Sequence, residues 1–267
     1  MFHAILSPHF DDAVLSCWQL LASPADVTVV NVFTEEPPAG TPPPWWDRAT
    51  GATDSVERMR ERRREDAAAL GLVGTSSAEL GLLDHQYRRA QLSLHEVVQR
   101  ITSEVAPQAI IHAPGAFDAH PDHVLVRDAA LELARAGRAV VLYADLPHAT
   151  ARGWPGWLSG ESSAPARDVA ADWDSVLRGA GLVVDKLVRS AHPLDAPTRT
   201  RKLQALALYE SQRAALDQFA FAPLDDPRAL AWEVSWEVPS SALRGTAELT
   251  REPVVADLPR QPLDDRV

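Results

Sequence analysis

A histidine and two aspartates that can bind a cation or move a proton follow a short apolar run at residues 2–6. They are His9, Asp11 and Asp12, and a helical apolar pattern over about residues 12–22 begins directly after them. His9 and Asp12 stand three positions apart and can converge on one point at a helix start, whereas Asp11 projects differently. A neutral imidazole together with a carboxylate suits a zinc-type cation. The alternative is that the aspartates only cap the helix.

A second cluster of the same kind lies at residues 118–123, with the sequence DAHPDH. It follows an apolar run at residues 108–113 that is typical of a buried strand, and a helical apolar pattern comes after it. The chain therefore repeats one arrangement, in which a strand leads into a polar turn and then into a helix. Two such turns at one edge of a parallel sheet would gather several ligating and acid–base groups around one cation. The repetition favours a metal site over simple helix capping.

Both clusters resemble the signatures of the PIG-L/LmbE family of zinc-dependent N-deacetylases. The family pattern is a His-Pro-Asp-Asp-Glu turn after the first strand and a later His-x-x-His turn, which is often His-Pro-Asp-His. Residues 120–123 match the second signature fully, while the first is matched with Phe10 in place of proline and Ala13 in place of glutamate. Further blocks that look familial follow in the family's order, so the resemblance spans about residues 2–212. These blocks are residues 62–66, 80–84, 145–147 and 202–212.

The resemblance implies a role for each polar residue of the two turns. The metal ligands would be His9, Asp12 and His123. Asp11 would be the general base, and His120 would stabilise the oxyanion or act as an acid. Asp122 would orient His120 and favour its charged form. The implied cation is zinc (Zn²⁺), and a set of two nitrogens and one oxygen also accepts ferrous iron (Fe²⁺).

Candidate substrate contacts come from other segments of the chain, and the resemblance implies one of them, an arginine. Arg62 or its neighbour Arg63 would reach substrate hydroxyls, and Asp84 and Asp145, each at the end of a predicted strand, would contact the substrate as well. Trp45 and Trp46 belong to a long proline-rich loop at residues 34–53. The two tryptophans would either cover a sugar ring or lipid chain, or simply pin this loop to the surface.

The elements that position these residues indicate an α/β fold. We expect a Rossmann-like three-layer sandwich with a mostly parallel sheet and an active site at the C-terminal ends of its strands. Apolar runs predict strands at residues 2–7, 27–33, 78–83, 108–113, 139–144 and 182–188. Alternation predicts a late edge or antiparallel strand at residues 230–238. Helical patterns predict helices at residues 12–22, 54–70, 93–105, 124–134 and 197–216.

The whole chain, at 267 residues, can form one large α/β domain or two small ones, and it shows no repeat or linker-like stretch. We expect a single domain over residues 1–267, with a polar tail at about residues 252–267. The net charge of −11 argues against a protein that binds the phosphate backbone of nucleic acid. With no signal-type segment and no apolar run of membrane-spanning length, we expect a cytoplasmic protein. The lone cysteine, Cys17, is expected in the core.

The function that the resemblance implies is hydrolysis of an acetyl or other acyl amide on an amino sugar or its conjugate, often N-acetylglucosamine. The nearest alternative is hydrolysis of a non-acetyl amide by the same residues. A metal phosphoesterase is a rival from another class, but two-metal phosphatases usually need more bridging carboxylates. A glycan-binding protein without catalysis is a second rival, and it would need neither Asp11 nor His120.

Overall fold

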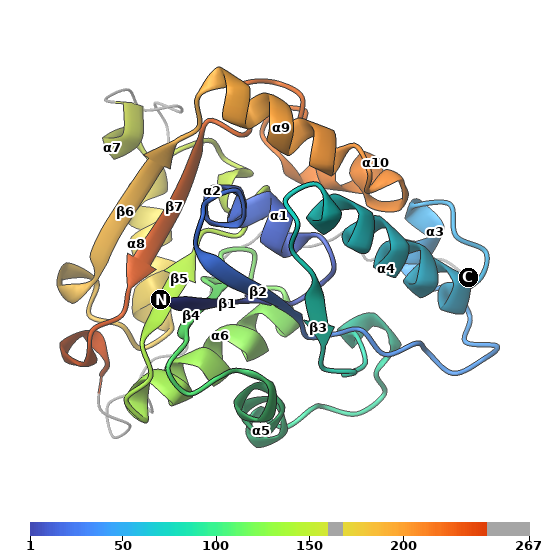
Figure 1. The fold of residues 1–267 in the computed structure, drawn as a ribbon, viewed down its shortest axis with the longest axis horizontal. Helices are drawn as coiled ribbons and strands as arrows, with labels where there is room; N and C mark the ends of the chain where they lie inside the picture. Colours follow the sequence, from blue (N-terminus) through green and yellow to red (C-terminus); the bar gives the residue numbers. More distant parts are fainter. Residues whose placement is uncertain (160–167, 245–267) are drawn as a thin grey trace.

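The computed structural model describes residues 1–159 and 168–244, and within them the chain forms one seven-stranded sheet in the order β3-β2-β1-β4-β5-β7-β6 (Figure 1). The strands are β1 (Phe2–Ser7), β2 (Asp26–Asn31), β3 (Ser77–Glu79), β4 (Ile110–Pro114), β5 (Val140–Tyr143), β6 (Val188–Pro193) and β7 (Trp232–Glu237). The first five strands are parallel, and β7 runs antiparallel to both β5 and β6. The mostly parallel α/β fold expected from the sequence is confirmed.

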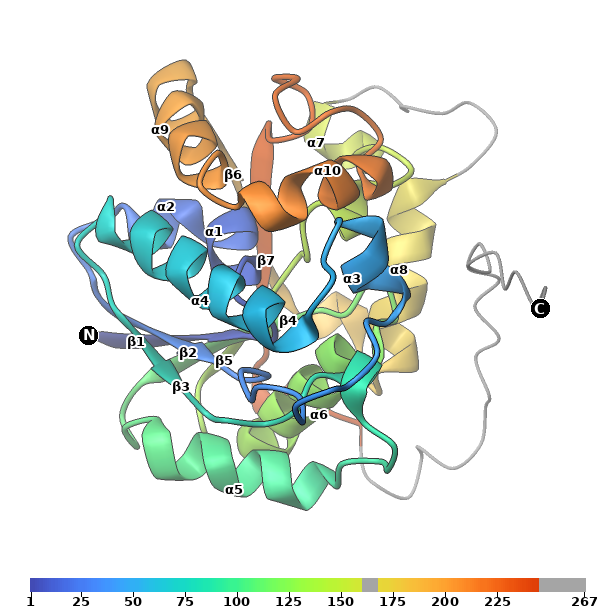
Figure 2. The same ribbon diagram turned by 90° about the vertical axis from the view of Figure 1, so that its right-hand side faces the viewer.

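Helices cover both faces of the sheet, so the fold has three layers. Figure 2 shows α1, α4, α9 and α10 above the sheet and α5 and α6 below it. The helices are α1 (Asp12–Ser16), α2 (Trp18–Leu21), α3 (Trp45–Ala49), α4 (Ser55–Gly71), α5 (Leu94–Glu104), α6 (Pro121–Arg135), α7 (Gly156–Ser159), α8 (Val169–Gly179), α9 (Ala196–Leu206) and α10 (Glu210–Phe219). Short 3₁₀ turns lie at His85–Tyr87, His148–Thr150, Val184–Lys186 and Ser240–Ala242. Among the described residues, no helix has the length and apolarity that crossing a membrane requires.

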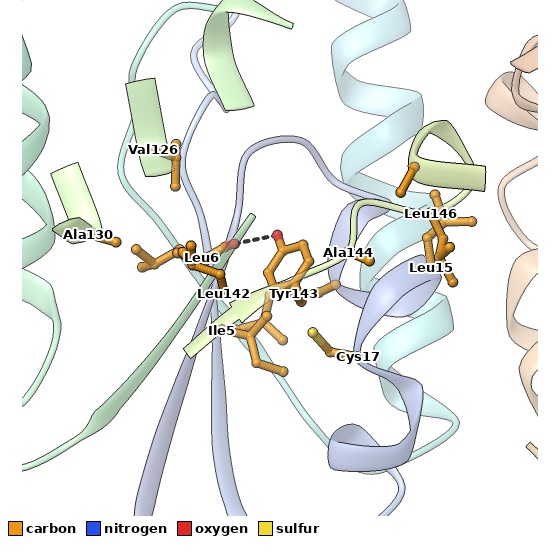
Figure 3. Packing of buried hydrophobic residues seen from close by; sticks show 14 of the residues in the cluster. Ile5, Leu6, Leu15, Cys17, Val126, Ala130, Leu142, Tyr143, Ala144 and Leu146 are labelled. Atoms are coloured by element: carbon orange, nitrogen blue, oxygen red, sulfur yellow. Dashed lines mark hydrogen bonds between the residues drawn. The ribbon is translucent and has the colours of Figure 1, made fainter. Parts of the chain in front are cut away.

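The core lies where the central strands meet the helices of both layers. Ile5 and Leu6 in β1 and Leu142 in β5 are fully buried, and burial of each such side chain stabilises the fold by about 1.5–3 kcal/mol. Tyr143 is also buried, and its hydroxyl donates a 2.8 Å hydrogen bond to the carbonyl oxygen of Leu6 (Figure 3). This bond ties β5 to the end of β1, immediately before the first histidine turn. Cys17 packs in the same core, as expected.

Two helices predicted as continuous are interrupted in the structure. The helix expected at residues 12–22 is divided into α1 and α2, because the buried carboxylate of Glu233 accepts 2.9 Å hydrogen bonds from the backbone N–H groups of Trp18 and Gln19. The helix expected at residues 197–216 is divided into α9 and α10, and Glu65 accepts a 2.8 Å bond from the backbone N–H of Ser211. In both cases a carboxylate from a distant element caps a new helix start.

Other predictions differ in position. The strand expected at residues 182–188 is wrong: Leu182 makes only an isolated bridge to Leu243, and β6 begins at Val188. The strand expected at residues 230–238 is confirmed as β7, which lies inside the sheet between β5 and β6. The loop at residues 34–53 contains the short helix α3. The polar tail expected at residues 252–267 lies outside the described residues.

Candidate metal centre

The two histidine turns meet at the carboxyl ends of β1 and β4, which are neighbours in the sheet. From β1 the chain crosses to β2 and β3 on one side, and later returns to β4 and β5 on the other. The strand order therefore reverses between β1 and β4. In open α/β sheets this reversal leaves a crevice outside the strand ends, where ligands bind.

The turn after β1 is held by hydrogen bonds between side chains and backbone. The Ser7 hydroxyl donates to the carbonyl oxygen of His9 at 2.5 Å and accepts from the backbone N–H of Ala13 at 3.0 Å. The backbone N–H of His9 donates to Asp12 Oδ2 at 2.8 Å. Phe10, which replaces the family's proline, is buried against Met59 and Tyr87. This network fixes the Asp12 carboxylate beside the His9 ring.

The turn after β4 is held in a less common backbone conformation. Ala116 and Ala119 have φ angles of 58° and 55°, in the left-handed region that costs a residue with a side chain roughly 1–2 kcal/mol. The strain is offset by surrounding contacts. The backbone N–H of Phe117 donates to Asp145 Oδ2 at 3.0 Å, and that of Ala119 donates to the carbonyl oxygen of Ala116 at 3.1 Å. Strain of this kind concentrates at functional sites.

Three potential metal ligands converge where the turns meet. Asp12 Oδ2 lies 3.5 Å from His9 Nδ1 and 3.4 Å from His123 Nε2. One ligand atom from each of the three residues lies within 4.8 Å of the other two. Two imidazole nitrogens and one carboxylate oxygen form the donor set of a catalytic zinc site, which keeps a position open for water or substrate. These residues therefore fit the cation that the sequence predicts.

Each histidine of this triad has a second carboxylate behind it. His9 Nε2 lies 3.3 Å from Asp122 Oδ2, and His123 Nδ1 lies 3.1 Å from Asp145 Oδ1. A proton on each of these nitrogens leaves the opposite lone pair facing Asp12, as metal-binding histidines require. Asp145, which the sequence analysis expected at the substrate, is buried in the structure with its carboxylate against His123. The Asp122 carboxylate lies 3.3 Å from His9 Nε2, and it is the backbone N–H of Asp122 that donates a hydrogen bond to the His120 ring.

The carboxylates around the two histidines of the triad favour positive charge there. Although burial acts to lower it, hydrogen bonds with Asp12 and Asp122 raise the pKa of His9 to about 10. Burial is likewise outweighed at His123, where the charges of Asp12 and Asp118 hold the pKa well above its usual value. Protons on these two imidazoles balance the charge of the surrounding carboxylates. A bound cation would take their place, since a ligating histidine must be neutral.

Asp11 lies beside the triad, and its carboxylate is free of hydrogen bonds from other residues in the described ranges. The residue is 8% exposed. Burial and the charge of Asp12 raise the pKa of Asp11 to about 6. A carboxylate with this pKa is ionised at neutral pH and still basic enough to take a proton.

His120 is arranged as a neutral hydrogen-bond donor. Its Nδ1 accepts a 3.2 Å bond from the backbone N–H of Asp122, so the neutral ring carries its proton on Nε2. Burial, together with the charges of His9 and His123, lowers the pKa of His120 to about 3. The charge of Asp122 favours the charged ring, as the sequence analysis expected, but burial and the charges of His9 and His123 outweigh it.

Of the predicted substrate-binding residues, Arg62 and Asp84 lie next to the triad. Asp84 Oδ2 is 3.9 Å from His9 Nε2 and 3.8 Å from Arg62 Nη1. Arg62 Nη2 donates to Asp47 Oδ1 at 3.2 Å. Arg63 instead pairs with surface carboxylates, including Glu79. The arginine on the side of the site is therefore Arg62, a choice that the sequence left open.

The two tryptophans of the proline-rich loop differ in their surroundings. Trp46 Nε1 donates a 2.9 Å hydrogen bond to Gln212 Oε1, which pins the loop to α10. Trp45 is 50% exposed. Asp47 follows the two tryptophans in the chain. Its buried carboxylate accepts a hydrogen bond from Arg62 in α4 and a 2.8 Å bond from the Tyr87 hydroxyl. Trp46 thus has the anchoring role, while Trp45 presents an aromatic surface to solvent.

Several residues at the site were missed by the sequence analysis. They are Asp47, Arg88, Asp118 and His148. Asp118 opens the second cluster and its Oδ1 lies 3.7 Å from His123 Nδ1, so its place in the motif was a usable signal. Arg88 and Asp47 carry no local signal, because each acts on a residue far away in the chain.

Comparison with known proteins identifies the family. The PIG-L family model, described as GlcNAc-PI de-N-acetylase, matches residues 4–134. The structure of the A40926 pseudoaglycone deacetylase Dbv21 is 30% identical and aligns over 89% of this chain and 96% of that chain, with a TM-score of 0.66. A deacetylase of teicoplanin biosynthesis, solved as a complex with bog, is 26% identical over 89% of this chain and 98% of its own, with a TM-score of 0.65. No functionally curated protein is recognisably similar in sequence to this chain. From these matches and the two histidine turns, we conclude that the chain belongs to the PIG-L family.

Proposed function

We propose that this protein is a divalent-metal-dependent hydrolase that removes an acyl group, most simply acetyl, from the amide nitrogen of an amino sugar or its conjugate. The observation that carries the proposal is the convergence of His9, Asp12 and His123 beside the uncommitted carboxylate of Asp11. Binding alone requires no such free base. The family and the deacetylases among its structural neighbours support the same reaction.

The cation would be held by His9, Asp12 and His123, with zinc as our first choice and ferrous iron as the alternative that this donor set accepts. Such a cation, when bound, lowers the pKa of a water and polarises a carbonyl. Asp122 and Asp145 keep the two imidazoles oriented toward it, through the contacts at 3.3 and 3.1 Å.

The proton transfers fall to Asp11. With a pKa of about 6, its carboxylate takes a proton from the attacking water and delivers it to the leaving amine. His120 contributes the neutral Nε2–H group, which donates a hydrogen bond to the oxygen that becomes negative when the carbonyl is attacked. The backbone N–H of Asp122, by occupying His120 Nδ1, keeps that proton on Nε2.

We further propose that the sugar lies against Arg62 and Asp84, whose polar groups suit hydroxyl recognition. Trp45 would contact the sugar or an apolar part of the conjugate with its exposed ring, and Trp46 would hold the loop in place. The neighbours named for the A40926 pseudoaglycone and for teicoplanin make these two compounds suitable test substrates, beside N-acetylglucosamine and its conjugates.

The test is amide hydrolysis by metal-depleted and metal-restored protein. The chain is treated with a chelator, dialysed, and supplied with zinc or ferrous iron. Release of free amine and of carboxylic acid is then measured for the acetyl substrates and for matched longer acyl amides. We expect activity to be lost with the metal and restored by one equivalent. Metal binding without amine release from any of these amides would refute the proposed reaction.

A further inference from the structure

The site contains two overlapping groups of potential ligands. Besides His9, Asp12 and His123, which we call the first triad, a second triad is formed by His9, His120 and Asp122. The two share His9 but use opposite sides of its ring, since Nδ1 lies 3.5 Å from Asp12 and Nε2 lies 3.3 Å from Asp122. A neutral imidazole has a single lone pair. His9 can therefore serve only one triad at a time.

The carboxylates of the two triads differ in their partners. Asp122 is fully buried, its Oδ1 is 2.5 Å from Arg88 Nη2, and its Oδ2 accepts a 2.9 Å bond from the backbone N–H of His85. Asp12 forms no ion pair with an arginine or lysine within the described parts of the chain. Because a guanidinium already balances the charge of Asp122 and occupies one of its oxygens, Asp12 attracts a cation more strongly.

Arg88 is held firmly in this position. Its Nη1 donates to the carbonyl oxygen of Leu83 at 2.9 Å, and its guanidinium lies 5.0 Å from the centre of the Phe33 ring. The side chain is 12% exposed. These contacts orient the guanidinium toward Asp122 before any cation arrives. Arg89, the next residue, is exposed and provides a matched comparison.

We propose that Arg88 selects the triad that holds the cation. By pairing with Asp122, Arg88 keeps that carboxylate as an acceptor for His9 Nε2–H and so directs the His9 lone pair toward Asp12 and His123. Without Arg88, Asp122 is a buried carboxylate with no guanidinium partner, and the second triad competes for the cation. A cation there would also take the Nε2 lone pair of His120. The ring proton would then have to move to Nδ1 and displace the 3.2 Å bond from the Asp122 backbone N–H, and His120 could no longer donate to the oxyanion. This inference rests on the metal-dependent function proposed above.

The proposed role of Arg88 in selecting the triad can be tested without an activity assay. Zinc affinity is measured by competition with a chromophoric chelator. In the wild-type background, His123→Ala should abolish binding at zinc concentrations that saturate the unmodified protein. In the Arg88→Met background, we expect the same His123→Ala change to weaken zinc binding by only about 10-fold, because the second triad remains. Adding His120→Ala to that double variant should then abolish binding.

Three controls complete the experiment. Arg89→Met should bind zinc as the wild type does and should still lose it with His123→Ala. Arg88→Lys keeps the charge and should restore the wild-type dependence on His123. Arg88→Gln replaces Arg88→Met if the latter does not fold, as judged by circular dichroism.

The inference is overturned if removing His123 eliminates zinc binding equally with and without Arg88. It is also overturned if the residual binding of Arg88→Met, His123→Ala does not depend on His120. A different result, in which the unmodified protein binds no zinc or ferrous iron at all, would refute the proposed function itself.

Discussion

The turn after β1, at residues 7–13, and the turn after β4, at residues 115–123, present the same kinds of side chain but are stabilised differently. The first relies on bonds within the turn, where Ser7 and Asp12 bind backbone groups a few residues away. The second includes Ala116 and Ala119 at positive φ and depends on distant partners. The ring centre of Phe117, for example, lies 5.0 Å from that of Trp173 and 5.4 Å from that of Trp236.

Because the two turns are stabilised differently, substitutions in them should have different consequences for catalysis and for stability. The first turn places the two proposed ligands, His9 and Asp12, and the proposed base, Asp11, within four residues whose positions are fixed locally. The second turn places the proposed ligand His123 and the proposed donor His120 on a strained backbone. β5 and the aromatic residues of α8 and β7 support that backbone. We therefore expect changes in the first turn to act mainly on catalysis, and changes in the scaffold of the second to act on stability as well.

The largest effect is expected for Asp11→Asn in the first turn. Loss of the general base should lower kcat by about 10²- to 10⁴-fold, the usual contribution of positioned acid–base catalysis. Zinc affinity should stay close to that of the wild type, since Asp11 is not in the first triad. Activity equal to the wild type would remove Asp11 from the mechanism, and loss of zinc would make it a ligand.

A smaller loss is expected for His120→Ala in the second turn. Removing one oxyanion donor typically lowers kcat by about 10²- to 10³-fold. His120→Gln, which keeps an N–H donor, should recover part of this loss, because the wild-type ring acts in its neutral form. If glutamine gives no recovery in steady-state kinetics, donation by a neutral ring is not the role of His120.

Gly115→Ala and Ser7→Ala compare how much the backbone of each turn contributes to the free energy of unfolding. A Cβ at Gly115 would lie 2.3 Å from the Phe117 ring and 3.1 Å from the carbonyl oxygen of Tyr143, so overpacking should lower the free energy of unfolding by about 2–3 kcal/mol. Ser7→Ala removes two hydrogen bonds and should lower it by about 1–2 kcal/mol. Urea denaturation measures both values. A larger loss for Ser7→Ala would contradict the contrast drawn between the turns.

The smallest effect concerns Asp66, in α4, whose carboxylate accepts hydrogen bonds from Asn31 and Tyr209 beneath the first turn. Burial raises its pKa from the usual 3.8 to about 7. The stability that this group contributes is therefore fully present below about pH 4 and is lost progressively as the pH rises to 7. Relative to Asp66→Asn, the free energy of unfolding of the wild type should fall by about 1 kcal/mol between pH 6 and pH 7. Parallel urea titrations of the two proteins would show no such difference if Asp66 titrates at its ordinary pKa.

The sequence predicted the parts of the molecule that are determined by local pattern. The buried strands β1, β2, β4 and β5 are apolar runs, and each histidine turn stands directly between a strand and a helix, so both the sheet and the convergence of the turns could be inferred. The PIG-L resemblance added an assignment of roles that spacing alone did not provide.

What the sequence did not predict depends on pairs of residues far apart in the chain. Glu233 interrupts the first helix from β7, 215 residues away. Asp145 and Asp122 were expected at the substrate and at His120, but tertiary packing places their carboxylates against the rings of His123 and His9. The pairing of Arg88 with Asp122 is likewise visible only in three dimensions.

The most direct test of the account is the number of zinc ions bound per chain in the wild type and in variants that remove one ligand from each turn. Equilibrium dialysis at a fixed free zinc concentration would be applied to the wild type, His9→Ala and His123→Ala. We predict one equivalent for the wild type and none for either variant, because the site needs both turns. Full binding in either variant would contradict the claim that the two turns form a single metal centre.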